Sequence, residues 1–532
     1  MKHSLKVIKP PKAFYFPIPE LTRKSKLIYD CNKCGIKNKS IGIQEIEPIV
    51  GEDYQGIVIL TQCISEDDNA KNKLLVNSSG TIVRSTARKN GINLAKQAAI
   101  LPALACYTNK KPTETQFKCC RSKLAERLEA LKPKLIICLG DMAFKFLFNL
   151  KNKNSMSKIR NRLIPNYEFN CMVFVTYNCS NILNNTRKRD LMDDIFSYTI
   201  EQALKWDLTR AVKMFKNIYI KRKNVTELLN ARKILEGIVI DQINDMYDVK
   251  EAFKQIKQRR SVAFDYETTN LSPYDEDFSA VYFAFGSHNH AWVFHEDLWK
   301  DKPLVWEIIK KNLIEILTSK RILKVIQNSK FEDLCSRYFL NIERINNIFC
   351  TMLATHVVDE RRGCTGQDFQ NLVRFGIPPY SEEIKRFLIT DDKLGEKQNK
   401  IREAPVQSMV KYNGLDVITC YNNFLLLDGD LLDSYPTGRE NYELLLRGHE
   451  KFANFTKRGI HIGTKEFEAL EEYINYKMQQ TMKAIELLPE VVSFNKHLAE
   501  ALPEKLDKDE ILKNLSIDSI AVNKPKRRKL SM

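Results

Sequence analysis

The stretch SVAFDYE, residues Ser261–Glu267, decides the fold of the second half of the chain. An apolar run that ends in acidic residues is typical of a β-strand buried within a sheet. Asp265 and Glu267 stand two positions apart, so both carboxylates point to the same face of that sheet. A hydrophobic core does not favour two acids there, so the pair marks either a solvated strand end or a functional site.

The residues after this strand continue the pattern of an α/β unit. Ala280–Gly286 and His290–His295 predict two hairpin strands, and Val305–Thr318 predicts a helix. A further strand, Ile322–Asn328, precedes several helices, the last of which contains Tyr412–Leu427. We therefore expect a second α/β domain around the Asp265 strand.

Two further acidic elements follow the first pair. Asp416 comes four residues after Tyr412, so both side chains share one face of a helix. Between the strand with Asp265 and the helix with Asp416, the segment QNSKFEDL (Gln327–Leu334) places acids where a strand ends and a helix begins. Each element alone is common by chance, and acids at a helix start also suit the helix dipole. Three acidic elements in this order fit phosphodiester hydrolysis, in which carboxylates hold divalent cations.

These motifs resemble the DEDDy 3′→5′ exonuclease domain of family A DNA polymerases, especially bacteriophage versions, which has a ribonuclease H-like fold. Phe264–Thr268, Val325–Leu340, Thr351–Ile377 and Lys411–Val417 carry the resemblance. It implies a proofreading nuclease that trims single-stranded 3′ ends of a primer–template.

The resemblance also assigns roles to single residues. Asp265, Glu267 and Asp416 would hold two Mg²⁺ or Mn²⁺ ions. Tyr412 would position or help to activate the attacking water. The product would be a nucleoside 5′-monophosphate.

The second motif leaves its acid open. The family spacing after Asn328 favours Glu332, and Asp333 directly after it is the alternative. Asn328, Lys330 and Phe331 are expected to contact DNA, with Phe331 stacking on frayed terminal bases. Packing of Phe331 in a helix core is an equally consistent interpretation.

The first half of the chain predicts another α/β domain. Gly56–Leu60, Lys134–Gly140 and Cys171–Tyr177 have the composition of buried parallel strands. The segment Gln116–Leu131 lies between the first two of these strands in the sequence. It predicts an amphipathic crossover helix.

Four of the thirteen cysteines have the spacing of ligands. Cys31 and Cys34 form a CxxC, and Cys106 and Cys120 lie downstream. Together with KPKLIICLGDMAFKFL (Lys132–Leu147), they resemble the iron–sulfur uracil-DNA glycosylases. The resemblance implies that these four thiolates bind a 4Fe–4S cluster, and Zn²⁺ is the alternative.

Two positions depart from this glycosylase family. The water-activating Glu of the family is Gln62 here, and the His after the last strand is Asn178. An amide cannot act as a carboxylate base. We therefore expect this domain to bind DNA with little or no uracil excision.

The overall expectation is an α/β multidomain protein: a uracil-DNA glycosylase-like domain, a ribonuclease H-like exonuclease domain and a C-terminal helical segment. The expected parts are an irregular lead-in (1–26), the iron–sulfur glycosylase-like domain (27–206), a helical connector (207–250), the exonuclease domain (251–435), a thumb-like helical segment (436–500) and a charged tail (501–532).

The segment Glu443–Leu470 resembles the start of a family A polymerase thumb, yet no palm motif follows. The resemblance implies a split polymerase whose palm and fingers lie on a separate chain. The formal net charge of +18 favours a polyanionic partner. The alternatives are a non-catalytic DNA-tethering subunit and, with less support, an active glycosylase. With no signal peptide or apolar run long enough for a membrane, a cytoplasmic protein is expected, in the host cytoplasm if it is phage-encoded.

Overall fold

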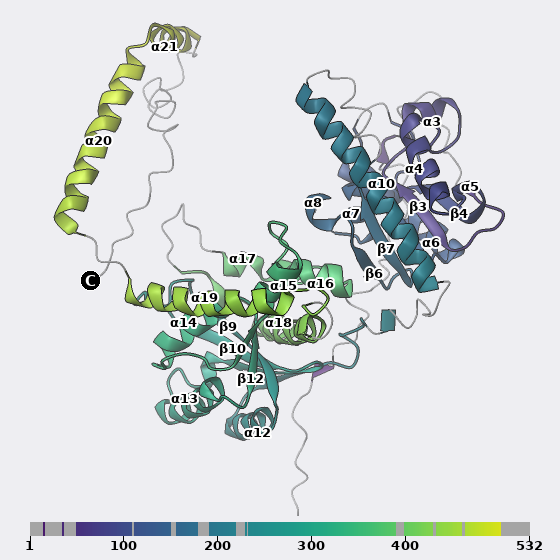
Figure 1. Cartoon of the computed structure of the whole chain (residues 1–532). Coiled ribbons are helices and arrows are strands. Elements are labelled where there is room, and N and C mark those ends of the chain that lie inside the picture. Colours follow the sequence, from purple (N-terminus) through teal and green to yellow (C-terminus); the bar gives the residue numbers. More distant parts are fainter. Residues whose placement is uncertain are drawn as a thin grey trace, which may run out of the picture. The chain divides into compact units, whose positions relative to one another are not determined.

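The strands form two separate sheets in the computed structural model (Figure 1). The chain divides into two units, Met1–Asn454 and Phe455–Met532, and both sheets belong to the first unit. The structure describes residues 14–15, 34–36, 49–108, 111–150, 156–178, 191–219, 229–230, 232–389, 398–428, 432–459 and 463–501.

The first sheet has six strands and a parallel centre. Its order is β2 (Ile49–Val50), β4 (Ala98–Pro102), β3 (Ile57–Thr61), β5 (Leu135–Leu139), β7 (Cys171–Thr176) and β6 (Leu163–Asn166). Neighbours among β4, β3, β5 and β7 run parallel, and the two edge strands run antiparallel. The three buried parallel strands predicted from the sequence are confirmed.

Helices cover both faces of this sheet. Alternate residues of β3 and β5 enter two hydrophobic cores, one on each face. One core packs against α6 (Glu114–Leu131) and α7 (Asp141–Leu147), and the other against α4 (Ser78–Lys89) and α10 (Leu191–Tyr219). The connections also contain the short helices α3 (Glu66–Ala70), α5 (Leu94–Gln97) and α8 (Met156–Ile159).

The second sheet has seven strands, with the strand of the acidic pair near its centre. Its order is β1 (Phe14–Tyr15), β8 (Val239–Ile243), β11 (His290–His295), β10 (Ala280–Gly286), β9 (Ser261–Thr268), β12 (Leu323–Ile326) and β13 (Ile348–Cys350). β9, β10 and β11 are antiparallel, and β12 runs parallel to β9. The predicted hairpin and the strand after it are thus confirmed.

One face of the second sheet packs on α12 (Met246–Lys257) and α13 (Pro303–Thr318), and the other on α18 (Val406–Leu426). Between these lie α14 (Ser329–Phe339), α15 (Thr351–Val358), α16 (Gln367–Phe375), α17 (Lys385–Leu388) and the short 3₁₀ turns Glu296–Leu298, Ser381–Glu383 and Ile401–Glu403.

Two short strands differ from the sequence prediction. β8 lies in the segment 207–250, which was expected to be a helical connector, so that expectation is wrong for β8 although α12 is a helix. Its five residues include Asp241 and Gln242 and are only partly buried, so no apolar run marks them. β1 likewise lies in the lead-in 1–26, expected to be irregular, and pairs with β8.

The C-terminal part is helical, as expected, with α19 (Gly438–Arg458), α20 (Thr464–Glu486) and α21 (Pro489–Ala501). None of the residues of α20 is buried. Most of the predicted tail 501–532 lies outside the described residues. Within the described part of the chain, no helix combines the length and apolar character needed to cross a lipid bilayer.

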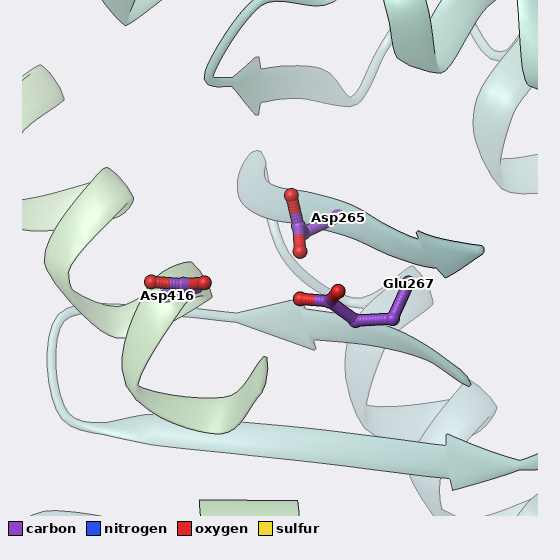
Figure 2. Close-up of side chains that lie close together, drawn as sticks. All are labelled: Asp265, Glu267 and Asp416. Carbon is purple, nitrogen blue, oxygen red and sulfur yellow. The ribbon is translucent and has the colours of Figure 1, made fainter. Parts of the chain in front are cut away.

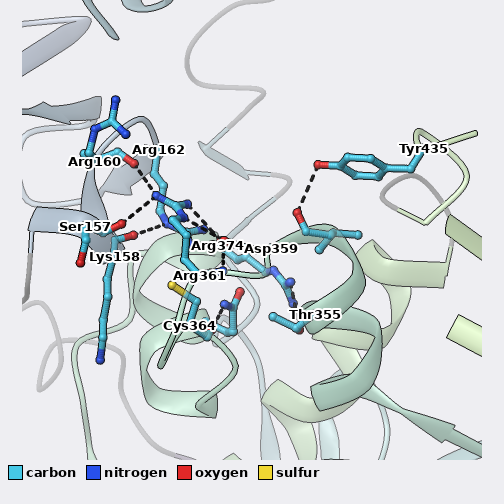
Figure 3. A network of polar contacts seen from close by, with 12 residues as sticks. Ser157, Lys158, Arg160, Arg162, Thr355, Asp359, Arg361, Cys364, Arg374 and Tyr435 are labelled. Atoms are coloured by element: carbon cyan, nitrogen blue, oxygen red, sulfur yellow. Dashed lines mark hydrogen bonds and ion pairs between the residues drawn. The ribbon is translucent and has the colours of Figure 1, made fainter. Parts of the chain in front are cut away.

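The two sheets of the first unit are joined by a charged junction (Figure 3). Asp359, directly after α15, pairs with Arg162 just before β6. Arg361 contacts the same carboxylate at 2.8 Å and donates hydrogen bonds to the carbonyls of Ser157 and Arg160, at 3.2 and 3.0 Å. One carboxylate is therefore the shared counter-ion of two guanidinium groups from the two sides of the junction.

We predict that Asp359→Asn lowers the free energy of unfolding by about 2 kcal/mol, because it leaves two part-buried guanidinium groups without a counter-charge. Urea unfolding followed by circular dichroism measures the change. Asp428→Asn is the matched control, because it removes an ion pair with Arg439 whose side chains are 41% and 38% exposed, and about 1 kcal/mol or less is expected. Equal losses in the two variants would contradict the role given to Asp359.

Candidate active site

Three carboxylates from two elements meet on one face of the second sheet. Asp265 and Glu267 project from β9, and Asp416 projects from α18, which packs across that face (Figure 2). One oxygen of each carboxylate lies within 4.8 Å of an oxygen of each of the others. The two-residue spacing on the strand and the helix above it thus bring together the three predicted metal ligands.

Burial and mutual repulsion make this cluster prefer protonation. Burial raises the pKa of Asp265 to about 7, and a 2.8 Å hydrogen bond from Asn413 Nδ2 opposes the rise. Burial, and next the charge of Asp265, also raise the pKa of Glu267 and Asp416. Among the described residues, no Lys, Arg or His forms an ion pair with any of the three. The group that would offset this repulsion is a bound cation.

The donor set fits a hard divalent cation. All three side chains offer carboxylate oxygens, which Mg²⁺ and Mn²⁺ prefer over nitrogen or sulfur. In the described part of the chain, this is the one group of three or more His, Cys, Asp or Glu side chains whose ligand atoms converge within 4.8 Å.

Tyr412 lies beside the cluster, one helical turn before Asp416. Interaction with the Tyr412 side chain lowers the pKa of the Asp416 carboxyl, but burial and the charge of Asp265 outweigh this effect. Burial, and next the charges of Asp416 and Glu267, raise the pKa of the Tyr412 hydroxyl. Tyr412 therefore remains a neutral hydrogen-bond donor at neutral pH.

The two acids of the second motif point to different surroundings. Glu332 is 3% exposed, and its Oε2 has no hydrogen-bond partner. Burial and the charge of Asp265 raise the pKa of Glu332. Glu332 thus lies next to the cluster.

Asp333 instead belongs to a structural ion pair. It accepts hydrogen bonds from Arg337 Nε at 2.8 Å and from the backbone N–H of Ile345 at 2.7 Å. The Asp333 side chain is 8% exposed. Each of its two carboxylate oxygens therefore already accepts a hydrogen bond from another part of the protein.

The three residues predicted to contact DNA lie at the start of α14 and have different surroundings. Asn328 is the N-cap in a left-handed conformation, with a φ of 57° and no side-chain capping bond. Phe331 packs against the hydrophobic core below the sheet. Lys330 lines a cavity of about 340 Å³, together with Ser329 and His449, whose Oγ and Nδ1 are 3.0 Å apart.

The two substituted glycosylase positions meet at one edge of the first sheet. Gln62 directly follows β3, Gly140 directly follows β5, and Asn178 lies two residues beyond β7. These strands are parallel, so their carboxyl ends meet. Asn178 Nδ2 donates a hydrogen bond to Gln62 Oε1. Gly140 has a φ of +108°, which side-chain-bearing residues rarely adopt, and a Cβ there would also lie 2.7 Å from Gln62 Cδ.

Three of the four predicted cysteine ligands surround one core. Cys34 and Cys120 are buried in the core between the first sheet and α6, and Cys106 packs against that core. Cys31 lies outside the described residues. The three described sulfurs do not all lie within 4.8 Å of one another. A tetrahedral zinc site with Zn–S bonds of about 2.3 Å would hold its sulfurs about 3.8 Å apart.

Sequence reasoning missed three polar residues that contact the carboxylates. Asn413 binds Asp265, Tyr380 Oη donates to Asp416 Oδ1 at 2.5 Å, and Gln367 Nε2 donates to the Asp416 carbonyl at 2.7 Å. Asn413 adjoins Tyr412 and was within reach of the motif. Tyr380 and Gln367 come from a segment without acidic spacing, so no signal marked them.

Comparison with known families identifies the two α/β parts. Residues 240–427 match the 3′-5′ exonuclease family model, and residues 49–200 match that of the uracil DNA glycosylase superfamily. A glycosylase-like domain is therefore followed by an exonuclease domain, in the predicted order.

Relatives of known function match the first domain. The type-4 uracil-DNA glycosylase of Archaeoglobus fulgidus is 29% identical over 126 residues, which are 23% of this chain and 61% of that protein. That of Sulfurisphaera tokodaii is 23% identical over 186 residues, 33% of this chain and 82% of that protein. The chain thus spans less than two thirds of the length of the first of these relatives.

Solved structures match the second domain weakly. Trypanosoma brucei RNase D in complex with RNA U12 is 15% identical, with a TM-score of 0.33, covering 42% of this chain and 73% of that chain. Brucella melitensis NrnC with bound Mg²⁺ is 15% identical, with a TM-score of 0.28, covering 39% and 92%.

The acidic cluster predicts an unusual dependence of folding stability on pH. A carboxyl whose pKa is raised on folding binds its proton more tightly when folded, so stability falls as pH rises from 3.8 to about 7 for Asp265. In EDTA, Asp265→Asn should stabilise the protein by about 2 kcal/mol at pH 8 and by clearly less at pH 5. Urea unfolding at both values tests this, with the exposed Glu307→Gln as control. The same effect at pH 5 and pH 8 would refute the proposed electrostatic origin.

Proposed function

We propose, from the premise that residues 240–427 form a 3′-5′ exonuclease domain, that this protein is a metal-dependent 3′→5′ DNA exonuclease. The observation that carries the proposal is the convergence of Asp265, Glu267 and Asp416 within 4.8 Å without a cationic partner among the described residues. Such a cluster disfavours folding unless cation binding offsets it, which is the requirement of a metal-dependent phosphodiesterase.

Asp265, Glu267 and Asp416 would hold two Mg²⁺ or Mn²⁺ ions. When bound, such ions supply an activated water and stabilise the charge that develops on the leaving 3′-oxygen. Tyr412 donates a hydrogen bond at this site and orients the attacking water. Its raised pKa keeps the proton needed for that role.

Glu332 is proposed as the fourth acid of the centre. The support is its position: it lies beside Asp265 and retains an oxygen without a hydrogen-bond partner. Asp333 is assigned a structural role, because Arg337 and Ile345 occupy its two oxygens. Asn328, Lys330 and Phe331 at the start of α14 are proposed to lie along the single-stranded 3′ end, as the sequence predicts.

We predict that Asp265→Ala and Glu267→Ala each lower Mg²⁺-dependent digestion of a 5′-labelled single strand by about 100-fold or more, because a ligand of the ions is lost. Glu332→Gln should lower the rate while the protein stays folded. Asp333→Asn should instead lower the unfolding midpoint by freeing Arg337.

The control is Glu307→Ala, which removes an exposed carboxylate on α13. Stepwise products from the 3′ end establish the polarity of the reaction, and an RNA strand of the same sequence tests the preference for DNA. Undiminished digestion by Asp265→Ala would sink the proposal. Digestion that is independent of divalent cations would do so as well. Intact DNA with unchanged binding would favour the non-catalytic tethering subunit.

A proofreading role beside a separate polymerase chain is the proposed context. The support is that Glu443–Leu470 resembles the start of a family A thumb. On α20, Phe467, Leu470, Tyr473 and Ile474 are 52%, 52%, 57% and 47% exposed. Such apolar exposure is consistent with a helix that packs on another chain.

The glycosylase-like domain is proposed to bind DNA without excising uracil. Gln62 and Asn178 hydrogen-bond to each other where the family has an acid and a histidine. Two neutral amides provide neither a base for water nor a cation to stabilise a leaving uracil anion.

The same domain is proposed to hold a 4Fe–4S cluster through Cys31, Cys34, Cys106 and Cys120. The three described cysteines share one core, and their sulfurs do not all lie within 4.8 Å of one another. A larger cluster matches that arrangement better than Zn²⁺ does. When bound, it would tie the N-terminal CxxC to α6.

We predict that the full chain carrying Asp265→Ala, which prevents digestion of the substrate, forms no abasic sites in a uracil-containing single strand. The reason is that Gln62 and Asn178 are neutral amides, which provide neither a base for water nor a cation for the leaving uracil anion. Alkaline cleavage of the labelled strand measures excision, and an active uracil-DNA glycosylase on the same strand is the positive control. Abasic sites formed at a rate that depends on protein concentration would show that the pocket is catalytic.

A further inference from the structure

Helix α16 packs into the core of the first domain and hydrogen-bonds to the second. Leu372 and Val373 on this nine-residue helix are 1% and 5% exposed and lie in the hydrophobic core of the first sheet, and Phe369 packs against that core. Gln367 and Asn371, one turn apart, instead contact α18 of the exonuclease domain. The helix therefore links the glycosylase-like core directly to the helix that carries Asp416.

On its exonuclease side, α16 contacts the helical turn that contains Asp416, a proposed metal ligand. Gln367 Nε2 donates to the Asp416 carbonyl at 2.7 Å and to Thr419 Oγ1 at 2.8 Å. Asn371 Nδ2 donates to Thr419 Oγ1 at 3.1 Å and to Tyr380 Oη at 3.3 Å. These donors fix the turn of α18 that contains Asp416.

Tyr380 extends the same network to the carboxylate itself. Its hydroxyl donates to Asp416 Oδ1 at 2.5 Å and lies 3.2 Å from Thr419 Oγ1. Because a carboxylate rotates easily about its terminal bond, a hydrogen bond at one oxygen sets the direction of the other. Tyr380 thus controls how Asp416 is presented to Asp265 and Glu267.

The other side of α16 is fixed against β6. Gly376 ends the helix with a φ of +66°, and a Cβ there would lie 2.3 Å from the carbonyl oxygen of Pro165 in β6. The guanidinium of Arg162 lies 5.1 Å from the centre of the Phe369 ring and pairs with Asp359. Within the described residues, α16 cannot shift without losing these contacts.

We propose that the glycosylase-like domain is a structural part of the exonuclease centre: β6 and Arg162 hold α16, and Gln367 and Tyr380 act as positioning residues for Asp416. This inference rests on the proposed function, because it assigns metal binding to Asp416. It gives the first domain a role in the nuclease that requires neither uracil excision nor contact with DNA.

Outer hydrogen bonds to a metal ligand typically change metal affinity by about 10- to 100-fold. Tyr380→Phe should therefore weaken Mn²⁺ binding by about 10-fold. Arg162→Gln, which acts through α16, should weaken it by about 3-fold. Both should lower kcat at limiting Mn²⁺ and leave the KM for DNA unchanged, because neither residue is placed on the DNA.

The test measures Mn²⁺ binding to the full chain without DNA, from the electron paramagnetic resonance signal of free Mn²⁺, and then kcat and KM. Arg439→Gln is the matched control, because it also removes an arginine that pairs with carboxylates, Asp428 and Asp433, and is distant in sequence from α16. It should bind Mn²⁺ as the parent does.

A second pair of variants separates backbone strain from contact with β6. Gly376→Ala and Gly237→Ala place a side chain at φ values of +66° and +70°, but an added Cβ meets nothing within 4 Å at Gly237. Weaker Mn²⁺ binding in Gly376→Ala alone supports the inference.

The outcomes distinguish this inference from the proposed function. If Asp265→Ala leaves Mn²⁺ binding unchanged, the metal centre itself is wrong, and the proposed function fails. If Asp265→Ala abolishes binding while Tyr380→Phe and Arg162→Gln match the parent, the nuclease stands and this inference is overturned. An equal loss in Arg439→Gln also overturns it, because the effect would then be general destabilisation.

Discussion

The structure depends on holding Asp265, Glu267 and Asp416 closer together than their mutual repulsion favours. Burial removes the water that would screen them, and within the described residues no cationic side chain replaces it. Hydrogen bonds from neutral groups, such as Asn413 and Tyr380, stabilise the charged forms only in part. The remaining imbalance gives the site its affinity for divalent cations, because binding relieves a repulsion that folding has imposed.

The close approach of α18 to the sheet makes this arrangement possible, and two small residues allow it. A Cβ at Gly286 in β10 would lie 2.6 Å from Val417 Cγ2, and a Cβ at Gly414 in α18 would lie 2.6 Å from Ile240 Cγ2. Any side chain at either position would lift the helix from the strands. Asp416, between Gly414 and Val417 in sequence, would then move away from β9.

The sequence predicted what depends on periodicity and missed what depends on tertiary contacts. The two-residue spacing of Asp265 and Glu267 and the four-residue spacing of Tyr412 and Asp416 each fix a shared face, and the structure brings Asp265, Glu267 and Asp416 together as predicted. Adjacent helical residues point about 100° apart, so spacing alone left Glu332 and Asp333 open, and packing of α14 separates their surroundings. β8 was missed because its half-buried residues resemble a polar connector. Tyr380 and Gln367 reach Asp416 only through the fold.

The glycosylase-like domain retains a well-packed core although the polar pair at its strand ends is neutral. Gln62 and Asn178 satisfy each other by a hydrogen bond, so the loss of charge leaves neither side chain buried without a partner. The core behind them also includes Leu372 and Val373 of α16, which come from the exonuclease domain. Without α16 this core would expose apolar surface, and without the core α16 would lose its support. The packing of the first core is therefore linked through α16 to the helix that carries Asp416.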